Sequence, residues 1–239
     1  MKKSSKGFTL VELLVVIGIL GVLMGSLFPA ISGAMLAAKT TAYSNKGINI
    51  FKGIFAANND RGDKPSVWPK DAQNTIEGDP EDIAGQVYGT ATDYFKKLFD
   101  MENYGTTEWT PIVDMAKPED LWGQGVPSYA GTFSKNCVGW CVASGLTDAM
   151  DDVLPVLISR NMDTSSLPVN GSVESKSQTT RVDLGKEYPE PFGDQAAVII
   201  RKSGQASVIK KKNRRVRDVY NDQSFAFPQS GVTFSYLRP

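Results

Sequence analysis

The sequence predicts an α+β fold, with one long N-terminal helix followed by a domain that contains both helix and antiparallel sheet. The helix is predicted because the only charged residue from Phe8 to Ala38 is Glu12. The sheet is predicted because the last third of the chain has short apolar runs, rich in Val and Ile, between turn residues. A helix packed against a small antiparallel sheet is the α+β arrangement.

The chain begins with a short basic leader, Met1–Gly7, which contains three lysines and no acid. The apolar block lies wholly after Gly7. An ordinary secretory signal has its apolar block before the cleavage site, so cleavage removes it. Cleavage after Gly7 would instead leave the apolar helix on the mature protein.

The apolar block has the length of a membrane span. As a helix, Phe8–Phe28 would extend about 31 Å, close to the roughly 30 Å thickness of the hydrocarbon core. The leader lysines precede it directly, and basic flanking residues tend to stay in the cytoplasm. We therefore expect a cytoplasmic N-terminus, with the chain from residue 30 onward on the other side. The alternative is a buried helix of a soluble protein, but such helices rarely run this long with one charge.

Glu12 is an anomaly within this apolar segment. A carboxylate in a membrane span costs about 2.5 to 3.5 kcal/mol on insertion scales, so it indicates a function and a partner. After cleavage at Gly7, Glu12 would be the fifth residue of the mature chain (12 − 7 = 5), and Phe8 would carry a new α-amine. Between staggered neighbouring subunits, this carboxylate and amine could neutralise each other. The alternative is that Glu12 only snorkels to the lipid headgroups.

The run Lys6-Gly7-Phe8-Thr9-Leu10-Val11-Glu12-Leu13-Leu14-Val15-Val16-Ile17 closely resembles the processing and assembly motif of type IV prepilins and type II secretion pseudopilins. The resemblance covers roughly the first 30 to 55 residues. It implies that a prepilin peptidase cuts after Gly7 and N-methylates Phe8, and that Glu12 is needed for assembly. It also implies a helix kink at Pro29, the twenty-second mature residue (29 − 7 = 22), because proline removes a helical hydrogen bond.

The helix is expected to continue beyond the span, so that residues 8–58 form one element. Residues 8–28 would cross the membrane and residues 29–58 would be amphipathic. Ile48, Phe51 and Phe55 recur at spacings of three and four and would pack on the head, opposite Lys39 and Lys46. A cluster of helix breakers from Asn58 to Pro65 ends the helix. The head domain would then occupy residues 59–239, in the lollipop shape that the resemblance implies.

Within the head, Asp79-Pro80-Glu81 reads as a helix start, because it combines an N-cap residue, a first-position proline and an acid in the first turn. It predicts a helix from Pro80 to about Met101. A weaker helical candidate covers Leu146–Ile158. Two further strand pairs and a surface loop are expected: a hairpin of 196–201 with 205–210, a terminal pair of 224–227 with 232–236, and a loop over 163–192.

Composition argues against an enzyme. The chain has 26 basic and 26 acidic residues, a balance that gives no reason to expect nucleic acid as a partner. It has no histidine, the commonest general base and metal ligand. No nucleophile motif is present either. We therefore expect no catalytic residues and no resident cofactor.

Cys137 and Cys141 are the only cysteines and lie four residues apart. An oxidising compartment would permit a disulfide between them, and in a helix their Cα atoms would be about 6 Å apart, within the range that a disulfide spans. Two free buried thiols are the alternative. A redox site or a zinc site is not expected from this pair, because the spacing is CxxxC and no histidine can complete a ligand set.

Two charged clusters admit a functional interpretation beside a structural one. Asp148, Asp151 and Asp152 could ligate calcium through oxygen, although a solvated helix start is favoured. The run 210–217 has six cations in eight positions and could bind DNA or another anionic surface. A solvated strand end is favoured there too.

The sequence therefore predicts a non-catalytic subunit of a type IV pilus-like filament, most closely a type II secretion pseudopilin. The resemblance implies other pilin subunits, prepilin peptidase and an inner-membrane assembly platform as partners. It also implies a single-pass protein of the bacterial inner membrane, whose head is periplasmic or on a surface filament. Alternatives are a surface adhesive or DNA-uptake pilin and, from another class, a membrane-anchored binding domain or enzyme.

Overall fold

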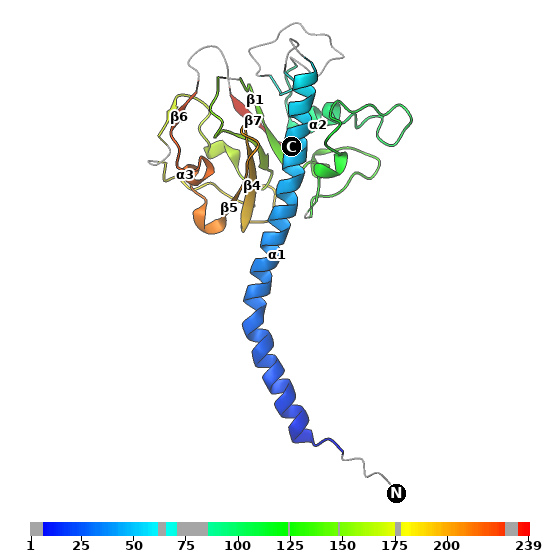
Figure 1. The fold of residues 1–239 in the computed structure, drawn as a ribbon, viewed down its shortest axis with the longest axis vertical. Coiled ribbons are helices and arrows are strands. Elements are labelled where there is room, and N and C mark those ends of the chain that lie inside the picture. The colour runs from blue at the N-terminus through cyan, green and yellow to red at the C-terminus, as the bar shows by residue number, and fades with distance from the viewer. Residues whose placement is uncertain are drawn as a thin grey trace. The chain divides into compact units, whose positions relative to one another are not determined.

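The computed structural model describes residues 7–61, 66–70, 86–123, 125–147, 149–174, 178–227 and 234–239. The chain divides into two units, Met1–Lys39 and Thr40–Pro239. The second is called the globular unit below. The expected α+β class is confirmed, because a long N-terminal helix precedes a domain with an antiparallel sheet (Figure 1).

The first element, α1, is a 51-residue helix, Leu10–Asp60. It begins and ends within two residues of the predicted bounds and runs through Pro29 without interruption. The kink expected at that proline stays a prediction. The part in the first unit exposes its apolar side chains nearly all round, including Leu10, Ile17 and Phe28. This surface has no protein to cover it within the described residues of the chain.

From Thr40 onward, α1 buries one narrow stripe of residues in the globular unit. The stripe recurs at spacings of three and four, as expected for one helix face: Thr40, Tyr43, Ser44, Gly47, Ile50, Gly53 and Ile54. This part of α1 therefore has one buried and one exposed face, but the predicted face was wrong in detail. Phe51 is only partly buried and Phe55 is 56% exposed. Two residues of the buried stripe, Gly47 and Gly53, are glycines. Because they have no apolar side chain, the hydrophobic pattern of the sequence does not indicate this face.

The main sheet has five antiparallel strands in the order β5-β4-β2-β1-β7. Their bounds are Trp140–Ser144 for β1, Pro155–Ser159 for β2, Ala196–Arg201 for β4, Ala206–Lys210 for β5 and Ser235–Leu237 for β7. The three inner strands are buried at every residue, which explains their continuous apolar runs. A separate two-stranded sheet pairs β3 (Ser172–Val173) with β6 (Phe225–Ala226).

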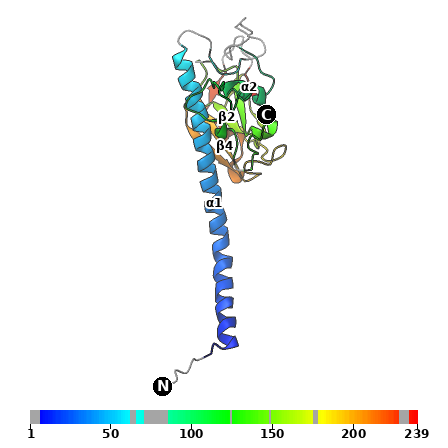
Figure 2. The same ribbon diagram turned by 90° about the vertical axis from the view of Figure 1, so that its right-hand side faces the viewer.

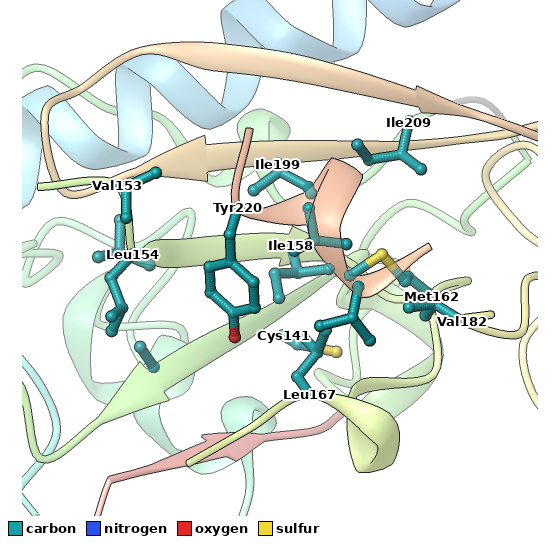
Figure 3. Close-up of a cluster of buried hydrophobic side chains, with 14 of the residues drawn as sticks. Cys141, Val153, Leu154, Ile158, Met162, Leu167, Val182, Ile199, Ile209 and Tyr220 are labelled. Carbon is teal, nitrogen blue, oxygen red and sulfur yellow. The ribbon is translucent and has the colours of Figure 1, made fainter. Parts of the chain in front are cut away.

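The main sheet is covered on both faces within the globular unit (Figure 2). On one face, Gly47 of α1 lies directly against Trp140 of β1 and Ile200 of β4. On the other, alternate strand residues such as Cys141, Ile158 and Ile199 join a core completed by Tyr220 and Phe225. Figure 3 shows this second layer, with Tyr220, Leu167 and Met162 directed at the sheet from separate segments.

Short helices connect these layers. The α-helices are α2 (Ala91–Leu98) and α3 (Val216–Val219), and the 3-10 turns are η1 (Pro118–Asp120), η2 (Lys135–Cys137), η3 (Thr164–Ser166) and η5 (Lys211–Asn213). The first amide of α2, at Ala91, donates to the carbonyl of Arg238 just after β7, at 2.8 Å. This bond fixes the start of α2 beside the β7 edge of the sheet.

The predicted helix from Pro80 to Met101 was too long. Residues 86–90 are not helical, and α2 begins where Thr90 accepts the amide of Asp93 as an N-cap, at 3.1 Å. Asp79 and Pro80, which were expected to start the helix, lie outside the described residues. The helix ends before Asp100, whose φ of 45° is incompatible with its continuation.

The helical candidate Leu146–Ile158 was wrong, because its last four residues lie in β2. The hairpin of 196–201 with 205–210 is confirmed as β4 and β5. The terminal pair was wrong: β6 pairs with β3, and β7 pairs with β1. The segment 163–192 is largely irregular, as expected, but it contributes Leu167, Val173, Val182 and Leu184 to the core.

Candidate functional site: the N-terminal segment

The Gly7–Phe8 bond lies in an exposed segment that precedes α1. Residues 7 to 9 are not helical, and Phe8 exposes 79% of its surface. Among the residues that the structure describes, no atom lies within 4 Å of the position that a Cβ on Gly7 would take. The bond is therefore accessible in this subunit, without any helical hydrogen bond to break.

Thr9 and Glu12 form a reciprocal cap on the first turn of α1. The amide and the hydroxyl of Thr9 each donate to Oε2 of Glu12, both at 2.8 Å. The amide of Glu12 donates back to Oγ1 of Thr9 at 3.3 Å. A threonine followed three residues later by a glutamate is the capping-box pattern, which satisfies two amides that the helix leaves free.

This cap assigns a role to Thr9 that the sequence interpretation missed. The signal was present in the sequence, because Thr-x-x-Glu before an apolar run is the pattern of a capping box. The cap also shows that the carboxylate of Glu12 has a partner within its own chain. The carboxylate is nevertheless exposed, so its outer side is open to a second group.

The segment that follows is long and apolar enough to cross a membrane. Within α1, an 18-residue window has a mean hydropathy of 2.5, and none of that window is buried inside the protein. The core helix of a soluble protein would bury such a window. A single-pass anchor is the arrangement that this exposed helix fits.

A comparison with protein families identifies the same segment. The family model for the prokaryotic N-terminal methylation motif matches residues 2–28. The chain carries the type IV prepilin and pseudopilin signature. No curated protein and no solved structure matches the chain. The match covers the basic N-terminal residues, the Gly7–Phe8 bond, the capped turn and most of the apolar half of α1.

Gly7, Phe8 and Glu12 all lie within the matched residues 2–28. The structure places Gly7 and Phe8 in the exposed segment before α1, and Glu12 in the exposed first turn of that helix. Lys2, Lys3 and Lys6 of the leader lie outside the described residues. N-methylation of Phe8 and the assembly role of Glu12 stay predictions of the signature.

Cys137 and Cys141 are both free and buried, against the expected disulfide. The expectation assumed a helix, but η2 ends at Cys137 and the chain is extended from Val138 into β1. Four extended residues span about 13 Å, well beyond the 7 Å over which Cα atoms can be bridged. The Cys137 thiol donates to the carbonyl of Ser128 at 3.8 Å, whereas burial in the sheet core raises the pKa of the Cys141 thiol to about 12.

The acidic cluster proposed as a calcium site is only partly described. The carboxylate of Asp151 accepts the amide of Val153 at 2.9 Å, and Asp152 pairs with Lys202 at 3.6 Å. Asp148 lies outside the described residues. Within those residues no group of three acidic, cysteine or histidine side chains is placed to hold a metal ion. Calcium at this cluster stays a prediction.

The basic run 210–217 lies where β5 ends, as expected for a strand end, and continues through η5 into α3. Lys211 pairs with Asp194, and Arg217 lies 3.9 Å from both Asp218 and Asp222. Other cations of the run have no ion pair within the described residues. The run is thus neutralised only in part.

Proposed function

We propose that this protein is a structural subunit of a type IV pilus-like filament, and specifically a pseudopilin of a type II secretion system. The observation that carries the proposal is the order of parts at the N-terminus: an accessible Gly7–Phe8 bond, a capped turn with Glu12, and an exposed apolar helix. Cleavage before the helix retains it in the mature protein, which serves a subunit that uses the helix for assembly.

The proposed chemistry consists of processing and packing. Prepilin peptidase cuts after Gly7 and methylates the amine of Phe8, and the apolar half of α1 holds the subunit in the inner membrane with its N-terminus cytoplasmic. An assembly platform then moves subunits into the filament, where their apolar helices bundle. Burial of apolar surface at about 25 cal/mol per Å² supplies the cohesion.

In the filament, the Glu12 carboxylate of one subunit would neutralise the Phe8 amine of a neighbour. An uncompensated charge in a low-dielectric helix bundle costs several kcal/mol, so this pair would fix the stagger between subunits. The exposed outer side of the capped carboxylate supports the proposal, because the internal bonds to Thr9 leave it open. The motif favours this structural role over an enzymatic one.

Intact-mass spectrometry of the protein from native membranes tests the proposal. We expect a mature chain that starts at Phe8 and carries one additional methyl group. A chain that still starts at Met1, or that is cut after the apolar block, would contradict processing of the pilin type. Sheared filaments that contain the mature chain, made only when the secretion machinery is present, would separate a pseudopilin from a simple membrane anchor.

A further inference from the structure

One edge of the globular unit has a group of cations that fold together from two distant segments. The group is called the basic edge and comprises Arg181, Lys210, Lys212, Arg214 and Arg215. The segment around Arg214 runs antiparallel to the segment around Arg181, because Val182 donates to the carbonyl of Arg214 at 2.7 Å and Val216 to that of Thr180 at 2.9 Å. None of the five has an ion pair within the described residues.

Arg181 and Arg215 face each other directly across this pairing. The two flanking hydrogen bonds make them a non-hydrogen-bonded pair, whose Cα atoms are only about 4.5 Å apart and whose side chains start closest together. Like charges opposite each other on neighbouring strands are destabilising. Asp218 accepts the backbone amide of Arg215 at 2.9 Å, but neither guanidinium forms an ion pair with an acid of the described residues. An external anionic surface would remove this repulsion.

The same unit has a surface of opposite sign. It consists of residues 99–123 and is called the acidic segment. Six of its charged side chains are exposed or partly exposed, and five of these are acids: Asp100, Glu102, Glu108, Asp114 and Glu119, with Lys117 as the sixth. Glu102 pairs with Lys96 at 2.6 Å, and Glu119 accepts the hydroxyl of Tyr104 at 2.8 Å. Glu108 and Asp114 have no ion pair within the described part of the chain.

These two surfaces are separate parts of the globular unit, because the acidic segment packs against Gly53 of α1 and binds Trp140 at the start of β1. The basic edge follows β5, the first strand of the sheet order, whereas the acidic segment follows α2, which is hydrogen-bonded to Arg238 beside β7, the last. Four strand spacings of about 4.8 Å separate the two edge strands by roughly 19 Å. In Figure 1 the segments after β5 and after α2 lie on opposite sides of the last part of α1.

We propose that the basic edge of one copy of this protein binds the acidic segment of the next copy. Because each copy has both surfaces at separate places, the contact is head-to-tail and uses two different patches. Such a heterologous contact repeats from copy to copy and generates an open helical array unless it closes into a ring. The inference rests on the proposed function, since it adds to the helix bundle a second, electrostatic contact between globular units.

Paired charge reversals in the full-length protein test this contact. The basic-edge variant is Lys210→Glu with Lys212→Glu and Arg214→Glu, which changes the net charge of that surface from +5 to −1. The acidic-segment variant is Glu102→Lys with Glu108→Lys and Asp114→Lys, which changes the net charge of that surface from −4 to +2. Each gives a subunit with two patches of the same sign, so the yield of sheared filaments should fall at least about tenfold, because like charges across an interface are strongly unfavourable. The matched control, Lys52→Glu with Lys135→Glu and Lys186→Glu, reverses three exposed lysines elsewhere and should retain wild-type yield.

The decisive arm is rescue. Both triple substitutions in one chain exchange the signs of the two surfaces, and co-expression of the two variants lets unlike copies alternate. Each arrangement should restore filaments to near the wild-type yield. Equal amounts of mature monomer in the membrane, by immunoblot and intact mass, exclude failed folding or processing.

The self-contact is overturned if both variants give the wild-type yield of filaments. It is also overturned if both variants lose filaments and neither the combined chain nor co-expression restores them. The latter result would indicate a different pilin subunit as the partner. Loss of binding to duplex DNA in the basic-edge variant, with filament yield unchanged, also overturns it and identifies the basic edge as a nucleic-acid surface. If the wild-type chain is processed but makes no filament when the machinery is present, the proposed function itself fails.

Discussion

The hydroxyl of Thr9 and the carboxylate of Glu12 bind each other across the first turn of α1, at 2.8 Å. The glutamate therefore has two separable properties: it caps the helix as a hydrogen-bond acceptor, and it carries a charge. The proposed pairing with a neighbour's Phe8 amine needs the charge, whereas the cap needs only an acceptor oxygen. Substitutions at these two positions can distinguish the roles.

Glu12→Gln should abolish or severely reduce filaments although it preserves the cap, because glutamine is equally suited to the third position of a capping box. Glu12→Leu should do the same and should insert into the membrane as well or better, since the span becomes more apolar. Filament yield by shearing, beside membrane immunoblots for monomer, measures both effects. Wild-type filament levels for Glu12→Gln would assign the residue to capping alone.

Thr9→Val is the matched control for the cap. It removes the hydroxyl, retains the carboxylate, and should weaken the helix start by about 0.5 to 2 kcal/mol, the usual effect of losing an N-cap. Because the charge of Glu12 is unchanged, filaments should still form. Complete loss of filaments in this variant, with normal processing, would show that the cap and not the charge sets assembly.

Gly47 is where α1 approaches the sheet most closely. A Cβ there would lie 2.6 Å from Cη2 of Trp140 and 2.7 Å from Cγ1 of Ile200. Trp140 cannot move freely, because its indole N–H donates to the carbonyl of Asp120 at 2.9 Å and its ring stacks on Tyr43 at 4.4 Å. Gly47→Ala should therefore destabilise the globular unit by about 1 to 3 kcal/mol through overpacking.

The control for Gly47 is Gly33→Ala in the same helix, where no atom lies within 4 Å of the added Cβ. Alanine is the better helix former by about 1 kcal/mol, so this change should leave the monomer unchanged or stabilise it. Thermal unfolding of the full-length monomers in detergent compares the two. Equal melting temperatures for both variants would show that α1 can shift away from the sheet at Gly47.

Local patterns were sufficient to predict some of the fold. The hairpin of β4 and β5 could be predicted from the sequence because both strands and their turn lie within one short segment. Gly204 in that turn has a φ of 78°. The first half of α1 could be predicted because it is long and apolar, with Glu12 as the only charge before Lys39. The Thr9–Glu12 cap was equally readable, since it depends on four consecutive residues.

The errors arose where distant parts of the chain decide the structure. Pro155–Ser159 is a continuous apolar run, which fits a buried helix or a buried strand, and only its pairing with β1 and β4 selects the strand. The terminal strands looked like partners because they are neighbours in sequence, but β1 and β3 provide their pairing edges. The basic edge likewise includes Arg181, which is distant in sequence from the run 210–217. Its position opposite Arg215 could not be predicted from that run alone.

The cysteines should behave as protected thiols and not as a disulfide. In the native protein neither should react readily with an alkylating reagent, because both side chains are buried. With its pKa raised to about 12, Cys141 would be a thiolate in only about one molecule in ten thousand at pH 8. In denaturant, both should label without any reductant, as read by mass spectrometry. If labelling in denaturant needed a reductant, the two cysteines would instead be joined in a disulfide.

Arg160 should be a larger contributor to stability than the acid with which it pairs. Its side chain is 4% exposed, and Nη1 donates to the carbonyls of Lys135, Asn136 and Val138 at 3.1 to 3.2 Å. Only Nη2 contacts Glu190, at 3.0 Å, and that carboxylate is 36% exposed. Arg160→Met removes the donor for three carbonyls and should destabilise the protein by about 2 to 4 kcal/mol.

Glu190→Gln tests the ion pair alone. The amide oxygen can still accept from Arg160, and an exposed carboxylate contributes little, so we expect a loss below about 1 kcal/mol. Denaturant unfolding of the full-length protein in detergent measures both variants against the wild type. If Glu190→Gln destabilises as much as Arg160→Met, the ion pair dominates, and the carbonyl bonds that hold the loop before β1 add little. The structure predicts the opposite order, because three of the four bonds of Arg160 to this region are made to backbone oxygens.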